Sequence, residues 1–383
     1  MKRSLLLLAI FWIPLFTLQA QTPVLVYDDS FREAARGAID SLYNRSPAEA
    51  QLLLSEWREE LPEHPIWTLW DAMEFWWVVL VDLEDETYDE QLFERMDDAV
   101  RAAEELLEGE PNHPDAWVIQ AVAQGYAARQ HANRERWIVS IRTARRALQA
   151  HQRLKEIAPD LPDNDLAEGL ILYYADYLPE AYTLVRAVSW LLPDGDRVKG
   201  LELLERASED AIFARPEALY FLGNIRLNYE NEYSRATEHL QLLTDRYPDN
   251  SFYQRLYVRS LFEQNQDRRA LERIESLLYR WDESGLANYD LLVEELMHWR
   301  GRILVRFLRY EEAYEAFESS YMAGLRLPNQ ASRRFLALSA YYAGVTAERL
   351  QNRDTAAFYF RRVQSLDTDR ELRRRASERM SDL

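Results

Sequence analysis

Apolar residues recur along most of the chain at the three- and four-residue spacing of amphipathic helices. After a short lead at residues 22–27, which we expect to be extended, helices are predicted to begin near Ser30, Pro47 and Pro65. The second of these starts combines a capping serine, Ser46, with a first-turn proline. Only 11 Gly and 14 Pro interrupt the pattern among 383 residues, so the chain is predicted to be all-helical.

Two helix pairs of similar length follow each other between Arg215 and Leu278. Small residues at Gly223 and Ala236 would let two antiparallel helices approach closely, and Pro248 would end the first pair because proline cannot continue a helix. This pattern resembles that of tetratricopeptide repeats. Ala236, Leu240 and Leu243 share their spacing with Ala270, Ile274 and Leu277, and Gly301, Ala313 and Phe317 share theirs with Gly344, Ala356 and Phe360.

The resemblance to tetratricopeptide repeats implies an all-α solenoid, a right-handed superhelix of antiparallel helix pairs. Because a solenoid grows by adding layers, the length of the chain does not set a number of domains. We expect a signal peptide at residues 1–20, a region of longer repeat-like helices at residues 21–210 and regular repeats at residues 211–383. The arginine-rich end at residues 369–380 is predicted to be a capping helix.

A second resemblance covers residues 114–280. It rests on the basic helix expected at residues 142–155, on Gly-Leu and Leu-Pro steps at Gly169-Leu170 and Leu178-Pro179, and on the turn Gly195-Asp196-Arg197. This region resembles a wider family of tetratricopeptide proteins that includes a eukaryotic mitochondrial outer-membrane protein linked to inclusion-body clearance. The resemblance implies a helical scaffold that binds partners, and it implies no catalytic residue.

The first twenty residues differ from the rest of the chain. Lys2 and Arg3 precede an apolar run from Leu5 to Phe16, and Ala20 is the small residue expected at a signal-peptidase site. We therefore expect cleavage after Ala20 and export to the periplasm or the extracellular medium. The alternative is an uncleaved membrane anchor, but the run is shorter than the roughly 18 residues that indicate a stable span. The sequence has no Cys, so neither a lipid-modified cysteine nor a disulfide can form.

The charge of the chain limits the classes of partner. Its net charge is −19, and removal of Lys2 and Arg3 leaves 44 basic against 65 acidic residues, a net charge near −21. Nucleic acid is therefore not an expected partner, because its phosphates would be repelled. Apart from Lys155 and Lys199, the remaining basic residues are all Arg. This bias fits either a high genomic GC content or adaptation to high salt.

Two stretches of opposite charge lie in the N-terminal half. Thirteen acidic residues at 82–110 accompany only Arg95 and Arg101, and their apolar helical stripe favours a solvated helix face over an acidic binding tail. At residues 134–155 the charge reverses, so we expect the two layers to attract each other as part of packing.

The helix predicted at residues 65–81 is apolar around nearly its whole circumference and includes Trp67, Trp70, Phe75, Trp76 and Trp77. It should be buried on several sides. An exposed aromatic platform for sugars is the alternative. A second buried helix is expected through Val185 and Trp190.

No sequence motif of a nucleotide site, a serine hydrolase or a zinc protease occurs. The six His are scattered, and Glu295-x-x-His298 is a single pair where a dinuclear site needs two. We therefore predict no catalytic residue, metal or cofactor. Paired carboxylates on neighbouring helices leave open a helical hydrolase acting on envelope glycans.

The predicted function is a non-enzymatic scaffold of the cell envelope that binds a protein or peptide in the groove of the superhelix. No integral span should remain after signal cleavage, and peripheral association with envelope complexes fits this role. Because guanidinium groups pair with carboxylates, we expect an acidic or C-terminal segment in the groove. The alternative is that these arginines pair with Glu on neighbouring helices. The residues expected to line the groove are Tyr220, Asn224, Asn228, Arg255, Arg259, His298, Arg302, Arg306, Tyr341 and Arg349.

We predict that the mature protein begins at Gln21. Mass spectrometry of the intact protein from its native host should give the mass of residues 21–383. A mature chain that still begins at Met1 would contradict this prediction.

Overall fold

The computed structural model describes residues 21–187 and 189–383, and the predicted signal peptide lies outside these ranges. Within them the chain forms α-helices and three short 3-10 helices, with no strand. The expected all-helical fold is confirmed. The α-helices are α1 (Asp29–Tyr43), α2 (Pro47–Glu60), α3 (Ile66–Val81), α4 (Asp89–Gly109), α5 (Pro114–Asn133), α6 (Trp137–Ile157), α7 (Asn164–Ala181), α8 (Thr183–Ala187), α9 (Arg197–Asp210), α10 (Arg215–Asn228), α11 (Tyr233–Arg246), α12 (Ser251–Glu263), α13 (Asp267–Ser284), α14 (Tyr289–Arg306), α15 (Tyr310–Gly324), α16 (Arg334–Arg349), α17 (Arg353–Ser365) and α18 (Arg370–Ser381), and the 3-10 helices are η1 (Leu25–Tyr27), η2 (Ser189–Leu191) and η3 (Gln330–Ser332).

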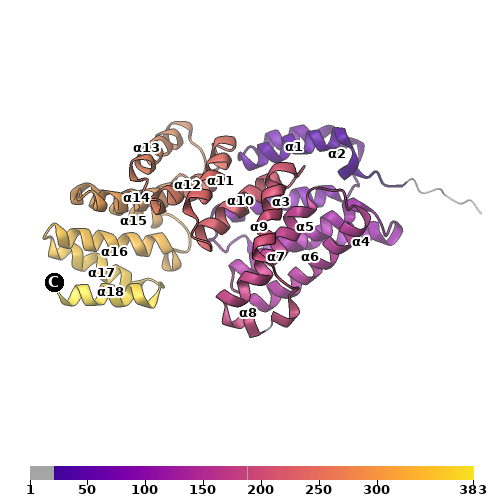
Figure 1. Cartoon of the computed structure of the whole chain (residues 1–383). Coiled ribbons are helices and arrows are strands. Elements are labelled where there is room, and N and C mark those ends of the chain that lie inside the picture. The colour runs from indigo at the N-terminus through magenta and orange to yellow at the C-terminus, as the bar shows by residue number, and fades with distance from the viewer. Residues whose placement is uncertain (1–20, 188) are drawn as a thin grey trace, which may run out of the picture.

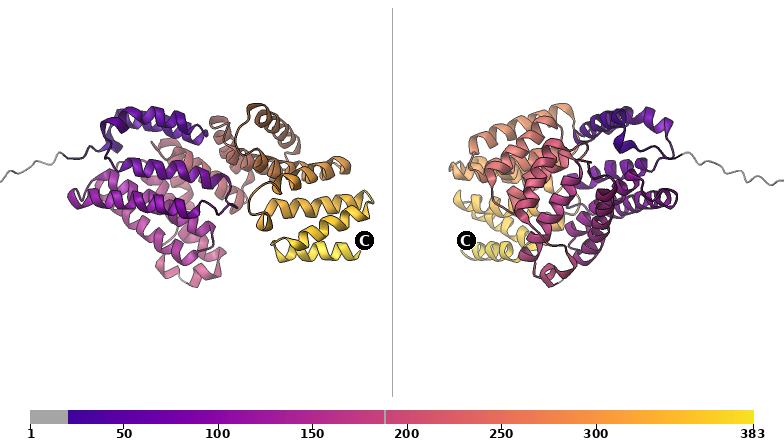
Figure 2. Two further views of the ribbon diagram at one scale, coloured as in Figure 1. Left: turned by 180° about the vertical axis from the view of Figure 1, so that it is seen from behind. Right: turned by 45° about the vertical axis from the view of Figure 1, so that its right-hand side comes forward.

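Neighbouring helices pack as antiparallel pairs that stack into a solenoid, with α18 covering its C-terminal end (Figure 1). The pairs are α1/α2, α3/α4, α5/α6, α7/α9, α10/α11, α12/α13, α14/α15 and α16/α17. The N-terminal helices and the last helices form two groups that lie side by side (Figure 2). No helix in the part of the chain that the structure describes is both long and apolar enough to cross a membrane.

The turns within the pairs fall into two kinds. In six pairs one residue with a left-handed backbone lies two positions before the second helix, which lets the chain reverse within a few residues. These residues are Arg45, Glu135, Asn231, Asn265, Leu308 and Gln351. The pairs α3/α4 and α7/α9 have longer connections instead, at residues 82–88 and 182–196.

The predicted close contacts within the C-terminal pairs are confirmed. A Cβ atom added to Gly301 would lie 2.6 Å from the ring of Phe317, and one added to Gly344 would lie 2.7 Å from the ring of Phe360. Both aromatic rings are fully buried. The recurring spacing of a glycine and a phenylalanine therefore reflects a contact in which a large ring packs on a helix backbone that has no side chain.

Helix α3 lies at the centre of the molecule, as its apolar circumference predicted. Trp77 packs between Tyr43 of α1 and Tyr253 of α12, with ring centroids 4.9 and 5.6 Å away, and Trp76 packs on Tyr126 of α5. Burial of Trp67, Trp76 and Trp77 rules out the alternative of an exposed aromatic platform on this helix. One continuous core includes residues from α1 to α5 and from α10 to α14, so it crosses the boundary expected near residue 210.

The lead at residues 22–27 is not extended throughout, because Leu25–Tyr27 forms the 3-10 helix η1. The buried carboxylate of Asp115 accepts hydrogen bonds from the backbone N–H groups of Leu25 and Val26, at 2.6 and 3.0 Å, and so turns the chain there. His64 and His113 donate to the carbonyls of residues 23 and 22. The repeated His-Pro entries of α3 and α5 therefore serve to anchor the N-terminal segment.

The prediction of a buried helix through Val185 and Trp190 is wrong. Helix α8 has five residues, and Trp190 in η2 is 79% exposed, although Val185 is buried. The main packing of this pair is between α7 and α9, where Gly200 lies against the backbone of Gly169. The segment at residues 182–196 is thus an excursion from the turn, and it adds no layer to the core.

The expected attraction between the acidic and basic stretches is found at Arg134, which forms an ion pair with Asp89, at 2.5 Å, and donates to the carbonyls of Leu83 and Asp85. Helix α4 packs on α5, and α5 packs on α6. Arg142, Arg145 and Arg146 of α6 are exposed and make no ion pair with any residue that the structure describes. The positive face of α6 therefore points to solvent.

The glycine contacts predict opposite effects for two substitutions of the same type. Gly301→Ala should lower the free energy of unfolding by about 1–3 kcal/mol, because the new methyl group must displace the Phe317 ring. Gly125→Ala in α5 meets no atom within 4 Å and should raise it by about 0.5–1 kcal/mol through helix propensity. Urea unfolding of both variants measures the difference, and equal shifts would contradict the packing described here.

Candidate functional site

The residues expected in the groove lie on α10, α12, α14 and α16, the first helices of the four C-terminal pairs. Three of them, Tyr220, His298 and Tyr341, are buried, so their side chains cannot contact a partner in this conformation. They were expected at the surface because they share the periodicity of the groove, but α12, α16 and α17 cover them through contacts with Phe252, Ser339 and Phe360, respectively. Asn224 and Asn228 are half-buried and hydrogen-bonded to each other, and Arg349 is exposed.

Two of the expected arginines bind groups within the protein. Arg255 forms an ion pair with Glu295, at 2.9 Å, and donates to the carbonyl of Val81, at 2.5 Å. Arg306 forms an ion pair with Asp267, at 2.7 Å. The alternative of internal pairing therefore applies to these two positions.

Arg259 and Arg302 differ from them, and Arg334 at the start of α16 joins them. None of these three, which we call the guanidinium cluster, forms an ion pair with another residue in the ranges 21–187 and 189–383. The Arg302 guanidinium lies between the rings of Phe262 and Tyr342, 5.2 and 4.6 Å from their centroids. Aromatic faces orient a guanidinium group and leave its edge available for hydrogen bonds.

Two members of the guanidinium cluster are close enough to His298 for their charges to act on it. Burial first, and then the charges of Arg302 and Arg334, lower the pKa of His298 well below its usual value. Burial also lowers the pKa of Arg259; the charge of Glu295 opposes that shift, and the charge of Arg334 adds to it. A bound carboxylate would reduce the mutual repulsion of these cations.

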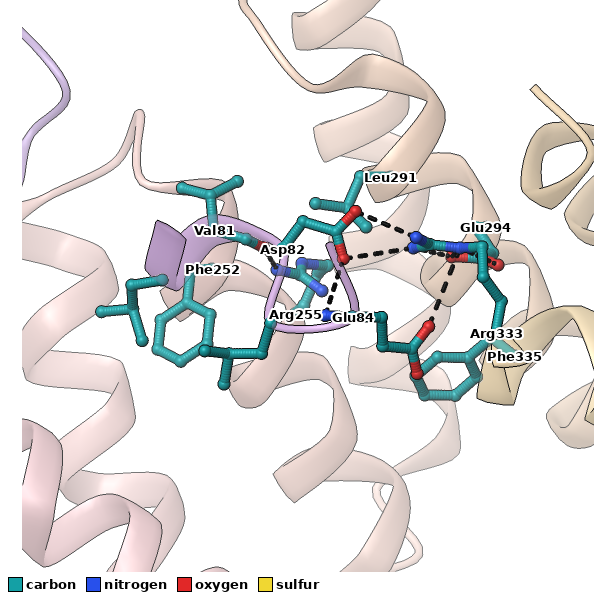
Figure 3. A pocket seen from close by; sticks show the side chains of 11 residues that line it. Val81, Asp82, Glu84, Phe252, Arg255, Leu291, Glu294, Arg333 and Phe335 are labelled. Atoms are coloured by element: carbon teal, nitrogen blue, oxygen red, sulfur yellow. Dashed lines mark hydrogen bonds and ion pairs between the residues drawn. The ribbon is translucent and has the colours of Figure 1, made fainter. Parts of the chain in front are cut away.

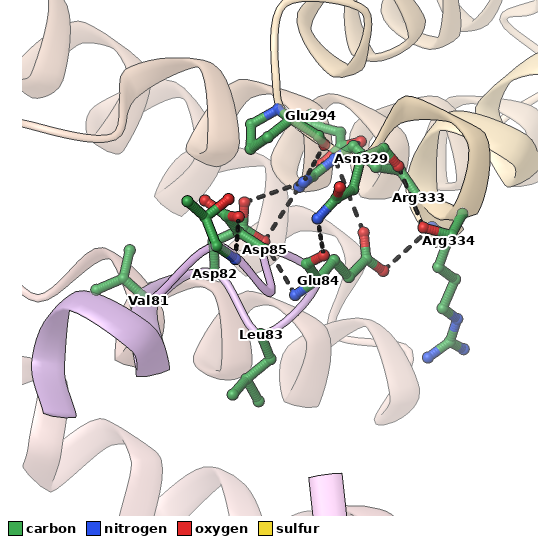
Figure 4. Close-up of polar contacts among 12 residues, drawn as sticks. Val81, Asp82, Leu83, Glu84, Asp85, Glu294, Asn329, Arg333 and Arg334 are labelled. Carbon is green, nitrogen blue, oxygen red and sulfur yellow. Dashed lines mark hydrogen bonds and ion pairs between the residues drawn. The ribbon is translucent and has the colours of Figure 1, made fainter. Parts of the chain in front are cut away.

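An acidic segment of the protein itself lies beside this region. The connection at residues 82–88, which we call the acidic loop, joins α3 to α4 and contacts the N-terminal ends of α14 and α16 (Figures 3 and 4). Asp82 forms an ion pair with Arg333, at 2.9 Å, and Glu84 lies 3.7 Å from the same guanidinium. Asn329 and the backbone N–H of Arg334 also donate to Glu84, so this part of the acidic run is not a solvated helix face.

Arg333 is the centre of these contacts. It is 2% exposed, and Glu294 of α14, which is 1% exposed, binds it at 2.8 Å. Three carboxylates thus share one guanidinium. Burial raises the pKa of Glu294 to about 7, although Arg333 opposes that shift, and burial also raises the pKa of Glu84. In Figure 4 the Arg333 side chain points toward Asp82, whereas the Arg334 side chain points away from it.

A cavity of about 140 Å³ lies between the acidic loop, α12, α14 and α16. Phe252, Leu291 and Phe335 form its apolar wall, and Arg255, Glu294 and Arg333 form its polar wall (Figure 3). The cavity is smaller than the roughly 300 Å³ of typical small-molecule pockets. Its size allows a side chain of a partner, or a few waters, to enter.

One group in the described ranges has the composition of a metal site. His64, His113 and Asp115 offer ligand atoms within 4.8 Å of one another, and all three are buried. The Nε2 atoms of both histidines lie 3.1 Å from backbone carbonyls and must carry protons to donate to them. Because the Asp115 carboxylate also accepts two backbone N–H groups, the role of this group is to anchor the N-terminal segment.

Neither a protein-family model nor a curated protein matches this sequence. Among solved structures, the chain is similar to the human IFIT1 dimer with PPP-AAAA, with 15% identity, 89% of this chain and 84% of that chain covered, and a TM-score of 0.29. It is also similar to the TPR domain of P58(IPK), with 12% identity, 77% and 95% covered, and a TM-score of 0.20. The fold assignment rests on the helix pairs themselves, and the resemblance to the family of the mitochondrial outer-membrane protein stays a prediction.

Sequence reasoning missed Arg333, Arg334 and the acidic loop as parts of one region. Arg333 and Asp82 are 251 positions apart, and no periodicity connects them. One available signal was the adjacent pair Arg333-Arg334 at the start of a predicted helix, where cations are unfavourable next to the helix dipole. Such a placement is stabilised when carboxylates from elsewhere lie close by.

The raised pKa of Glu294 predicts how stability depends on pH. The folded state keeps the proton up to about pH 7, whereas an unfolded glutamate releases it near pH 4.3. The contribution of Glu294 is therefore fully present below about pH 4 and is lost as the pH rises to 7, by an amount on the order of 3 kcal/mol. Urea unfolding between pH 4 and 8 should show that the free energy of unfolding of the unmodified protein falls more steeply with rising pH than that of Glu294→Gln. Glu315→Gln at an exposed position is the matched control and should leave the slope unchanged. Parallel pH profiles of the protein and Glu294→Gln would contradict the assignment.

Proposed function

We propose that this protein is a non-enzymatic scaffold that binds an acidic segment of a partner protein on the first helices of its C-terminal repeats. The observation that carries the proposal is the guanidinium cluster of Arg259, Arg302 and Arg334. None of these three cations forms an ion pair with another described residue, in a chain whose net charge is −19, and the charge of Arg334 acts on both Arg259 and His298. Guanidinium groups bind carboxylates through paired hydrogen bonds, so an acidic peptide is the ligand that best matches this surface.

The acidic loop supports this choice of ligand. It is an acidic segment whose carboxylates bind Arg333 at the start of α16, and Arg255 of α12 donates to the carbonyl of Val81, the residue just before the loop. The same chemistry is available from the guanidinium cluster, which has no internal acidic segment bound to it. A partner segment could therefore extend the contact that the loop begins.

We further propose that the scaffold acts in the cell envelope, since residues 1–20 have the pattern of a signal peptide. The alternative of a glycan hydrolase is not favoured. A glycosidase needs two carboxyl groups facing each other across the substrate. Asp82 and Glu294 at the smaller cavity both bind Arg333, and Glu205 at a larger cavity of about 410 Å³ binds Arg226 and His239.

The test uses synthetic peptides as probes. A fluorescein-labelled oligoglutamate with a free C-terminus should bind the protein at low salt, and an oligoglutamine of the same length should not. Arg259→Gln, Arg302→Gln and Arg334→Gln together should weaken binding by about a hundredfold, because each solvent-accessible ion pair contributes up to about 1 kcal/mol. Fluorescence anisotropy measures the affinity, and an amidated oligoglutamate shows whether the terminal carboxylate contributes.

The control is a variant with the same change of charge elsewhere. Arg142→Gln, Arg145→Gln and Arg146→Gln remove three exposed cations from α6 and should keep the affinity for oligoglutamate within about threefold. Equal losses in both triple variants would mean that net charge alone attracts the peptide, and the proposal would then be wrong. Affinity capture from the native envelope with both variants identifies the natural partner.

A further inference from the structure

The excursion, described at residues 182–187 and 189–196, lies at one end of the N-terminal helices (Figure 1). Trp190 is 79% exposed and Leu184 is 54% exposed. The excursion contacts the start of α6, where the ring of Tyr182 lies 4.7 Å from that of Trp137 and Ile138 is 63% exposed. A single exposed apolar residue is ordinary, but this group gathers two aliphatic side chains and a tryptophan beside one helix end.

A positive face borders this apolar group. On α6, Arg142 follows Ile138 by one turn, and Arg145 and Arg146 follow in the next turn, so all lie on the same side of the helix. These three arginines are exposed and make no ion pair within the described part of the chain. Arg186 lies within the excursion itself, and its guanidinium donates to the carbonyls of Pro179 and Glu180.

Acidic residues are few in these two segments. None occurs from residue 136 to residue 155, nor from residue 181 to residue 193, in a chain with 65 acidic residues, and Asp194 and Asp196 lie at the end of the excursion next to α9. The first part of the excursion and the first turns of α6 therefore carry only apolar, neutral polar and positively charged side chains. Such a combination of apolar side chains and arginines has the chemistry of a surface that binds anionic lipids.

We propose that the tip formed by the excursion and the start of α6 docks on the surface of an anionic lipid bilayer. Trp190, Leu184 and Ile138 enter the boundary between headgroups and acyl chains, where tryptophan is favoured. Arg142, Arg145 and Arg146 lie against the lipid phosphates. A tryptophan that is 79% exposed, beside arginines that form no ion pair in the described ranges, matches the boundary of an anionic bilayer, where aromatic rings lie at the level of the headgroups. This proposal is independent of the guanidinium cluster and its peptide.

The test is sedimentation of residues 21–383, the whole described fold, with vesicles. Vesicles of equimolar phosphatidylglycerol and phosphatidylcholine should bind the protein, and vesicles of phosphatidylcholine alone should not. Arg142→Gln, Arg145→Gln and Arg146→Gln together should lower the partition coefficient by about a hundredfold, since each arginine near an anionic surface contributes about fivefold. Leu184→Ser with Trp190→Ser should lower it by about tenfold or more.

Matched variants carry the same changes at other places. Arg353→Gln, Arg361→Gln and Arg370→Gln remove three exposed, unpaired cations from α17 and α18, and Tyr279→Ser removes an exposed aromatic ring from α13. Both should bind the anionic vesicles as the unmodified protein does. The proposal is overturned if the protein does not bind them, if phosphatidylcholine alone binds equally, or if the controls lose as much binding as the tip variants.

A second measurement does not depend on the folding of the serine variant. Brominated phosphatidylglycerol quenches tryptophan fluorescence only within the bilayer, so it should quench part of the emission of the unmodified protein. Trp190→Phe keeps an apolar ring and should bind the vesicles while losing that quenched component. Quenching that persists in Trp190→Phe would assign the contact to another of the 11 tryptophans and would overturn the proposed orientation.

Discussion

The structure depends on the burial of one helix whose whole circumference is apolar. Helix α3 cannot be covered by its own partner α4 alone, because one neighbour shields only one side of a helix. Its tryptophans are therefore packed by Tyr43 of α1, Tyr126 of α5 and Tyr253 of α12. The requirement to surround α3 brings α12, which belongs to the sixth helix pair, against the first two pairs, so helices far apart in the sequence share one core.

The two functional proposals both arise from turns that depart from the common geometry. Six helix pairs reverse direction through one left-handed residue within a few positions. The pair α3/α4 instead inserts the acidic loop, and the pair α7/α9 inserts the excursion that exposes Trp190. The acidic loop binds Arg333 of a distant repeat, whereas the excursion presents apolar side chains to solvent.

The sequence predicted what depends on neighbours along the chain. The spacing of Gly301 and Phe317 could be read because both residues belong to one helix pair, and α3 could be read as buried from its composition alone. The contact of Asp82 with Arg333 could not, because it joins layers that are adjacent only after the chain has folded around α3. The same limit applies to Trp190. The apolar residues next to it in the sequence suggested a buried helix, but α7 packs directly on α9 and leaves Trp190 exposed.

The ion pair of Asp82 with Arg333, together with the hydrogen bond from Asn250 to the carbonyl of Tyr43, ties the first layers to the later ones across more than 200 positions of the chain. An open solenoid can bend and stretch along its length, since each repeat contacts only its neighbours. Contacts between distant repeats restrict this motion for the repeats that lie between them. The repeats up to the start of α16 are therefore held at a fixed distance from α3, whereas α17 and α18 lie beyond the last of these contacts and can move with less resistance.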